Sequence, residues 1–368
     1  MADDELELGE RDHEEVVDFP PSERRIHTQG YDLSLNTLEE QWKDGTLILP
    51  DFQREYVWDN AKASRLIESL LLNIPIPSLF LSENADAQYE IVDGHQRVYS
   101  VIRYLDNQFA LSGLRIQQEL IGKRFFKLPE REQRFLRTRV IRAIIISADS
   151  APAMKFEVFE RLNTGGLALN AQEVRNAMYR GPLNEKLKEL ERDAGFRHCL
   201  GSKTPRRRMV DRELVLRFLA LSDRLNAYRP PLLRFLNEYM HDNQDAKVPW
   251  LTERADRFQR TTGLVADLLG KSAFRVIDRE GAPLERNINR AVFDAQMLVF
   301  SVADPITARE CKAEIIKAFG SLFEDADFLD AIRRATGDRA RTYERVRNVA
   351  AALEETGVAV NLASLGKL

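Results

Sequence analysis

The chain has 368 residues, of which 44% are hydrophobic and 30% charged, so it has enough apolar surface for a packed core and too much for a disordered protein. At this length we expect two domains, with one elongated domain as the alternative. The formal net charge of -4 excludes a general attraction to nucleic acid, so any such contact needs a local basic patch.

The first segment, residues 1–27, is acidic and has little apolar periodicity, which predicts a flexible tail. It has neither the basic start nor the apolar run of a secretory signal. No apolar run long enough to span a membrane, about 18 residues, occurs in the chain. Cys199 and Cys311 stand in no metal-ligand spacing and are typical of a reducing compartment. We therefore expect a cytoplasmic protein without membrane contacts.

Helices and strands are mixed in the next part of the chain, up to about residue 148. Apolar spacing predicts a short helix between Tyr31 and Trp42, with Ser34 or Asn36 as its cap. Similar signals predict helices after Asp59, after Gly94 and in 128–138. Short apolar or β-branched runs predict strands at 47–49, 79–81, 89–92 and 139–147. From Ser150 onward almost every segment has helical periodicity, which predicts an all-helical second half.

The stretch YEIVDGHQRVYSVIRYL, residues 89–105, predicts a strand, a tight turn and a helix. A helix N-terminus attracts anions, and Arg97 in its first turn has a donor fork that suits phosphate. Gly94 allows close backbone approach, Gln96 has hydrogen-bonding groups for a base or sugar, and Asp93 is suited to capping the helix or holding a divalent cation. The structural alternative, that Asp93 caps the helix and Arg97 pairs with a surface acid, stays open on physical grounds.

Three further polar clusters could contact phosphate or nucleic acid. Gln53 and Arg54 follow a predicted strand, and a polar turn with Asn163, Thr164 and Gly165 follows Arg161. Each is equally typical of ordinary surface or capping residues. A basic run is suited to phosphate-backbone contact, although arginine-rich faces are usually only solvated; it contains Lys203, Arg206, Arg207 and Arg208.

Several catalytic motifs are missing from the sequence. It contains no Walker-type glycine loop, no Cys-x-x-Cys pair, no HExxH and no Gly-x-Ser-x-Gly. Its five histidines are scattered and form no His-Asn-His nuclease arrangement. A self-contained zinc-dependent or HNH nuclease is therefore not expected.

Four motifs, taken in order, resemble a known family: PDFQREYVW, LIESLLLNIPIPSLFL, IVDGHQR, and FERLNTGG followed by LNAQEVRNA. This is the DGQQR-motif family, found at the N-terminus of GmrS-type modification-dependent restriction proteins and related to the ParB and sulfiredoxin nucleotide-binding fold. The resemblance covers roughly residues 30–180. The ordered set of motifs is much more specific than any one of them.

The resemblance implies an α+β protein with a ParB/sulfiredoxin-like mixed α/β domain at 28–180 and an all-helical domain at 181–368. It implies that nucleotide is bound by Gln53, Arg54, Asp93, Gly94, His95, Gln96, Arg97, Arg161, Asn163, Thr164 and Gly165. Asp93 and Arg97 would be catalytic, and Asp93 would hold the metal. His95 is a departure, because the family commonly has Gln there and His titrates near neutral pH.

The resemblance also implies a domain that binds, and in several members hydrolyses, a nucleoside triphosphate with Mg²⁺ in defence against phage or foreign DNA. Many members carry a fused HNH nuclease. Without one, DNA cleavage would belong to a separate partner, or the protein would only sense and bind DNA, with the helical half used for coupling, homo-oligomer formation or DNA contact. Two alternatives are a non-catalytic ParB-like regulator that binds DNA or a partner, and a metal-dependent nuclease at Asp93.

Overall fold

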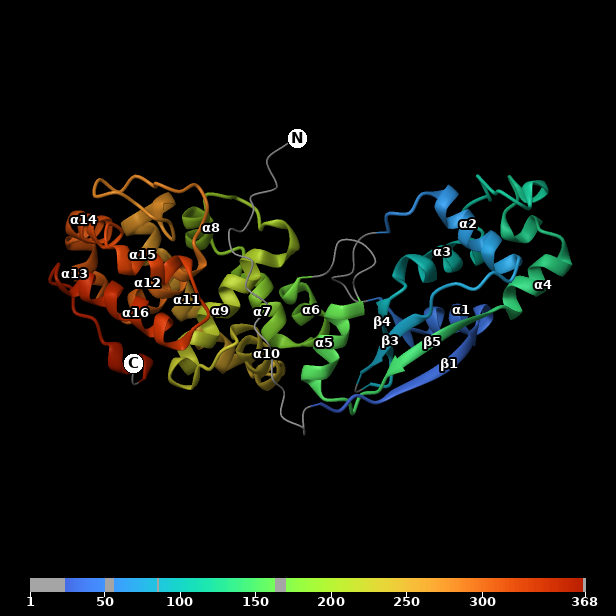
Figure 1. The fold of residues 1–368 in the computed structure, drawn as a ribbon, viewed down its shortest axis with the longest axis horizontal. Coiled ribbons are helices and arrows are strands. Elements are labelled where there is room, and N and C mark those ends of the chain that lie inside the picture. Colours follow the sequence, from blue (N-terminus) through green and yellow to red (C-terminus); the bar gives the residue numbers. More distant parts are fainter. Residues whose placement is uncertain (1–23, 50–55, 85, 163–169, 367–368) are drawn as a thin grey trace. The chain divides into compact units, whose positions relative to one another are not determined.

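The computed structural model describes residues 24–49, 56–84, 86–162 and 170–366 of the chain. Residues 19–170 form one compact unit, and residues 171–368 belong to a second. We call these the N-terminal unit and the helical unit (Figure 1). The N-terminal unit combines a mixed sheet with helices, which confirms the predicted α+β class, whereas the likeness to the ParB and sulfiredoxin fold stays a prediction.

The N-terminal unit contains five strands and five α-helices among its described residues. The strands are β1 (Thr28–Ser34), β2 (Leu47–Ile48), β3 (Leu79–Glu83), β4 (Tyr89–Asp93) and β5 (Val140–Ile146). The α-helices are α1 (Leu35–Asp44), α2 (Asn60–Leu71), α3 (His95–Leu105), α4 (Glu130–Thr138) and α5 (Pro152–Leu162).

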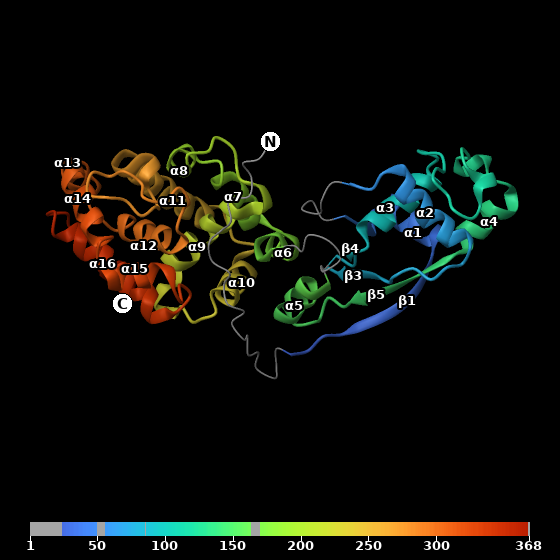
Figure 2. The same ribbon diagram turned by 45° about the horizontal axis from the view of Figure 1, so that its top comes forward.

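The strands form one sheet in the order β1-β5-β3-β4-β2. The β3–β5 and β2–β4 pairs are parallel, and the other two pairs are antiparallel. Alternate sheet residues such as Leu81, Ile91 and Ala143 are buried in one core with side chains of α1, α2 and α3. These three helices lie together beside the sheet in both views (Figures 1 and 2). The core thereby fixes the start of α3 at the end of β4.

Two helix starts follow directly from cap residues. Ser34 accepts a hydrogen bond from the N–H of Thr37 at α1, and Asp59 accepts one from the N–H of Lys62 at α2. Both side chains satisfy donors that an uncapped helix leaves without an intrahelical acceptor. Of the two caps predicted for the first helix, the structure has Ser34, and the predicted cap Asp59 of α2 is confirmed.

Glu68 ties a long connection to α2. Its buried carboxylate accepts hydrogen bonds from the backbone N–H groups of residues 115, 116 and 117, the shortest at 2.8 Å. Burial alone would raise the pKa of Glu68, but these backbone donors outweigh it and lower the pKa below its ordinary value. The charged form of Glu68 therefore stabilises the loop.

The sequence did not predict β1. Its residues TQGYDLS lack apolar alternation, and five of the seven are exposed. The strand forms because β5 pairs with it along its whole length, from Thr28 opposite Ile146 to Ser34 opposite Val140. A cross-strand ion pair of 3.0 Å between Asp32 and Arg142 adds to this pairing.

The helical unit consists, in its described residues, of α-helices and short 3₁₀ turns with two isolated β-bridges. The helices are α6 (Ala171–Met178), α7 (Pro182–Leu190), α8 (Ala194–Leu200), α9 (Val210–Arg224), α10 (Leu232–Asn243), α11 (Val248–Leu269), α12 (Arg290–Phe300), α13 (Pro305–Glu310), α14 (Lys312–Leu322), α15 (Ala326–Arg333) and α16 (Arg339–Glu354). The predicted helical character of the second half is confirmed.

Helix α9 is central to the helical unit, since residues on all its sides are buried. Apolar side chains such as Leu216 and Phe218 join one large core, and α9 contacts α12 within it. Buried ion pairs supplement that core: Arg217 bonds Asp294 of α12 at 2.5 Å, and Arg212 bonds Glu191 at 2.8 Å. Such charges are tolerated inside a protein because each has a hydrogen-bonded partner.

No helix among the described residues is long and apolar enough to cross a membrane.

Candidate functional site

The junction between β4 and α3 is built around Gly94. This residue has φ of +105° and ψ of 7°, and a Cβ atom there would collide with Cδ2 of Leu79 on the neighbouring strand. Glycine is therefore required both by the backbone conformation and by the close packing. Val98 is the first residue of α3 to donate its N–H to a carbonyl of the helix, at Gly94. The first turn directs its N–H groups and the positive end of the helix dipole out of the N-terminus.

The guanidinium of Arg97 is engaged by backbone carbonyls and by the carboxylate of Asp93. One guanidinium nitrogen donates to the carbonyls of Pro77 and Ser78, the latter at 3.1 Å, and the other donates to Asp93 at 2.6 Å. The Arg97 side chain is 11% exposed and that of Asp93 38%. Burial lowers the pKa of Arg97, and the nearby carboxylate of Asp93 opposes this shift. Arg97 thus ties α3 to the segment before β3 and orients the more exposed Asp93 carboxylate.

Gln96 brings a second motif to the same helix. Its Oε1 accepts hydrogen bonds from the N–H groups of Val57 and Trp58, at 3.0 and 3.3 Å. One turn further along α3, Ser100 Oγ lies 2.9 Å from the hydroxyl of Tyr56, and the rings of Tyr56 and Tyr99 are 5.0 Å apart. The structure therefore places the end of the motif PDFQREYVW against the start of α3. Gln53 and Arg54 of that motif lie outside the described residues.

Comparison with protein-family models identifies the N-terminal part of the chain. Residues 35–180 match the model described as GmrSD restriction endonuclease, N-terminal domain. This part of the chain is similar to the N-terminal domain of GmrSD restriction endonucleases. The match includes α1, the DGHQR junction and α5, and confirms the family resemblance. No curated protein matches the chain.

His95 is the residue at which the chain differs from the DGQQR motif that the sequence was predicted to resemble. Its side chain is buried, and burial lowers its pKa, so the ring is neutral at neutral pH. Gln96 must point its Nε2 towards His95, because its Oε1 accepts the two backbone N–H groups. The Nε2 atom of Gln96 lies 3.4 Å from Nδ1 of His95, and a hydrogen bond between them requires the tautomer of His95 with its proton on Nε2.

The third predicted cluster of the GmrSD domain is only partly described. Arg161 lies in the last turn of α5, is 77% exposed and pairs with Glu157 at 2.6 Å, one helical turn earlier. Asn163, Thr164 and Gly165 lie outside the described residues. Helix α5 contacts β4, the strand that ends at Asp93. The role of this cluster in ligand binding stays a prediction.

The basic run lies just before α9 in the helical unit, outside the GmrSD match. Arg206 bonds the fully buried Asp211 at 2.5 Å, and Arg208 bonds Glu173 at 3.1 Å. Lys203 and Arg207 are exposed. The ion pairs of Arg206 and Arg208 with carboxylates reduce the attraction that the run offers to a phosphate backbone. Its role in DNA binding stays a prediction.

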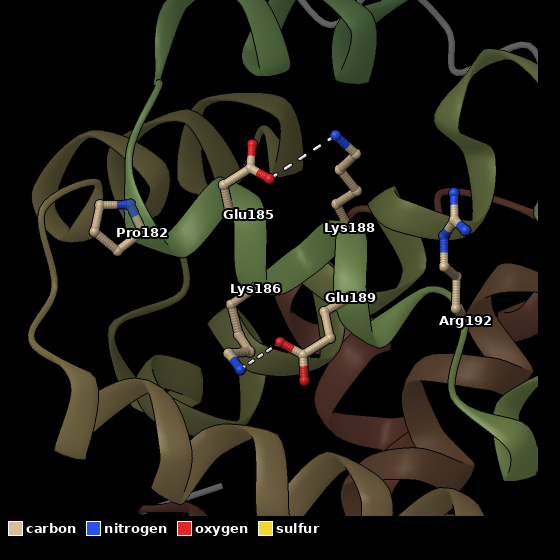
Figure 3. Close-up of a pocket in the computed structure, with 6 residues that line it drawn as sticks. All are labelled: Pro182, Glu185, Lys186, Lys188, Glu189 and Arg192. Carbon is tan, nitrogen blue, oxygen red and sulfur yellow. Dashed lines mark hydrogen bonds and ion pairs between the residues drawn. The ribbon is translucent and has the colours of Figure 1, made fainter.

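A cluster of metal-ligating side chains or a surface hollow could also hold a ligand in the described part of the chain. Among the described residues, no group of three His, Cys, Asp or Glu side chains is arranged to hold a metal ion. A shallow hollow on α7 is lined by Pro182, Glu185, Lys186, Lys188, Glu189 and Arg192 (Figure 3). Its lysines face glutamates, Lys186 and Glu189 at 2.5 Å and Lys188 and Glu185 at 3.8 Å. None of the predicted site residues lines this hollow.

Sequence reasoning missed the partners that complete the junction. The carbonyls of Pro77 and Ser78 and the N–H groups of Val57 and Trp58 are backbone groups, which no side-chain pattern reveals. A signal for the second contact was present, because Gln96, Tyr99, Ser100 and Arg103 stand at i, i+3, i+4 and i+7. This spacing predicts a second face of the helix beside its apolar stripe.

Proposed function

We propose that the GmrSD-type domain binds a nucleoside triphosphate with Mg²⁺ at the β4–α3 junction and hydrolyses it. The observation that carries this proposal is the turn at Gly94, which puts the N-terminus of a helix with a buried apolar face directly at the end of β4. A helix N-terminus stabilises phosphate through its N–H groups and dipole. The family match supports the wider role, a restriction-type protein acting in defence against foreign DNA.

The residues around the turn fit a magnesium nucleotide. Mg²⁺ that is bound through nucleotide phosphates needs one or two protein carboxylates, and Asp93 supplies one that is partly exposed. When bound, Mg²⁺ would neutralise charge that develops on the phosphate oxygens. Arg97 holds the Asp93 carboxylate in place through the 2.6 Å ion pair. In hydrolysis, water would attack the terminal (γ) phosphorus. The bond from this phosphorus to the β–γ bridging oxygen would break, to give a nucleoside diphosphate, inorganic phosphate and a proton.

The proposed division of labour leaves DNA cleavage to a separate effector. The sequence has no HNH arrangement. In this proposal, nucleotide turnover regulates a partner nuclease or another defence subunit, and the partner cuts the DNA. Comparison of the affinities for ATP, GTP, CTP and UTP identifies the preferred nucleotide. The non-catalytic ParB-like regulator remains the competing function, and it predicts nucleotide or DNA binding without phosphate release.

The test is equilibrium binding of ATP, GTP, CTP and UTP with and without Mg²⁺, together with phosphate release. We expect at least one nucleotide to bind, and Asp93→Asn to remove the Mg²⁺-dependent part of the affinity and the turnover. Asp44→Asn is the matched control, because Asp44 is an exposed aspartate that accepts a hydrogen bond from Thr46 N–H at the end of α1. Failure of all four nucleotides to bind, or unchanged binding and turnover in Asp93→Asn, would refute the proposal.

A further inference from the structure

We propose that Gln96 is a positioning residue, which holds residues 56–58 against α3, rather than a group that contacts the nucleotide. This inference rests on the proposed function, since it concerns the same junction. The family signature alone would assign Gln96 to the ligand. The geometry assigns its amide oxygen to the backbone N–H groups of Val57 and Trp58 instead.

The contact is a continuous face of α3 and not a single bond. Gln96 accepts the two N–H groups, Tyr99 packs its ring on Tyr56 at 5.0 Å, and Ser100 lies at hydrogen-bond distance from the Tyr56 hydroxyl. Arg103 stacks over the same tyrosine ring, 4.8 Å from its centroid. These four residues recur at helical spacing and form one stripe beside the apolar stripe that enters the core.

The orientation of the Gln96 amide supports this role. The N–H groups of Val57 and Trp58 can only donate, and the amide oxygen is the only acceptor in the Gln96 side chain. Oε1 therefore faces them, and Nε2 lies on the side of His95, 3.4 Å from its Nδ1. To bond a ligand with its oxygen, Gln96 would have to release both N–H groups. The side chain is therefore engaged in assembling the junction in the absence of ligand.

Loss of this contact should weaken nucleotide binding indirectly. With the amide oxygen gone, residues 56–58 would sample several conformations beside the helix N-terminus, and a ligand would have to reorder them on binding. If only about one tenth of the molecules held residues 56–58 in the conformation that binds nucleotide, the apparent affinity would be roughly tenfold weaker. A direct ligand contact could produce the same loss, so affinity alone does not separate the two roles.

Hydrogen–deuterium exchange of the peptide containing Val57 and Trp58 separates them, measured without ligand in wild type, Gln96→Met and Gln96→Glu. Met has the length of Gln but no acceptor, so we expect faster exchange of these two amides and roughly tenfold weaker Mg²⁺-nucleotide affinity. Glu keeps an acceptor oxygen at the same reach, so we expect it to restore slow exchange. Gln133→Met is the matched control, since Gln133 donates to the carbonyl of Leu128 at 2.8 Å and should change neither readout.

The outcomes distinguish the two roles. Weaker affinity with unchanged exchange in Gln96→Met would overturn the inference and make Gln96 a ligand contact. Faster exchange with unchanged affinity would show that the contact does not serve the site, and would also overturn it. If wild type binds none of the four nucleotides, the proposed function fails, and the exchange data still show whether Gln96 holds residues 56–58.

Discussion

Replacement of Arg97 should mainly reduce the stability of the fold, whereas replacement of Asp93 should mainly reduce nucleotide binding. The Arg97 guanidinium is 11% exposed and donates to two backbone carbonyls and to Asp93, whereas Asp93 is 38% exposed. Hydrogen bonds from a charged donor contribute about 1.5–3 kcal/mol each, and a partly solvated ion pair contributes about 0–1 kcal/mol. One Arg97 nitrogen is shared by both carbonyls, so we take the lower value for each bond and expect Arg97→Ala to cost about 3 kcal/mol. Asp93→Asn should cost less than about 1 kcal/mol.

Differential scanning calorimetry measures these costs in the intact protein, with the two units fitted as separate transitions. For a unit of this size, about 1 kcal/mol shifts the midpoint by about 2–4 °C. Arg97→Ala should lower the midpoint of the N-terminal unit by roughly 6–12 °C, and Asp93→Asn by less than about 4 °C. Asp93→Asn should nevertheless remove Mg²⁺-dependent nucleotide binding, because its carboxylate faces the proposed site.

Arg65→Ala serves as the control for loss of an arginine, because Arg65 is exposed and its Nε lies 3.5 Å from the carbonyl of Ala61 in its own helix. Its midpoint should stay within about 2 °C of wild type. An Arg97→Ala protein with wild-type stability would refute the reasoning, because the guanidinium would then not be engaged with the backbone. Equal losses of stability in Asp93→Asn and Arg97→Ala would refute it as well.

Three further replacements test the environment of the site. Glu68→Gln should cost about 1–3 kcal/mol at pH 7, because it removes a charged acceptor of backbone N–H groups. Since the pKa of Glu68 is lowered in the folded state, its contribution is present above the ordinary value of 4.5 and is lost as the pH falls, so denaturation of the variant should depend less steeply on acid pH. Gly94→Ala should cost about 2–4 kcal/mol, from positive φ plus collision with Leu79, whereas Gly45→Ala has φ of +80° and open space and should cost about 1 kcal/mol; equal costs in urea denaturation would contradict this. Burial lowers the pKa of His95, so the unfolded state takes up its proton first as the pH falls below 6.5 and the folded state loses stability there. His95→Gln should remove this loss, and parallel midpoint curves for variant and wild type between pH 7 and about pH 5 would contradict the prediction.

Local signals predicted most of the N-terminal unit. The caps at Ser34 and Asp59 and the apolar stripe after Gly94 each act within one helical turn, so the residues that decide them are neighbours in sequence. Strand β1 was missed because its pairing energy comes from β5, more than a hundred residues later. Its own residues do not alternate between apolar and polar, and sequence patterns cannot report a partner's contribution.

The candidate site shows the same difference between what neighbouring residues predict and what distant partners decide. The sequence predicted which residues stand at the strand–helix junction, and the structure places Asp93, Gly94, His95, Gln96 and Arg97 there. What it could not predict is the partner of each side chain. Arg206 and Arg208 illustrate the same point, because they look like a basic patch in the sequence and bond carboxylates in the folded unit.

The partner of a polar side chain is hard to predict from sequence because the same group fits several partners. A guanidinium fork fits two backbone carbonyls as well as two phosphate oxygens, and a glutamine amide fits backbone N–H groups as well as a base. Burial decides between these uses, since a side chain that is covered before the ligand arrives must already have protein partners. Arg97 meets this condition at 11% exposure, whereas the Asp93 carboxylate keeps 38%. The motif therefore combines residues that assemble the junction with a carboxylate that remains accessible, and replacement of either kind would weaken the proposed nucleotide binding for different reasons.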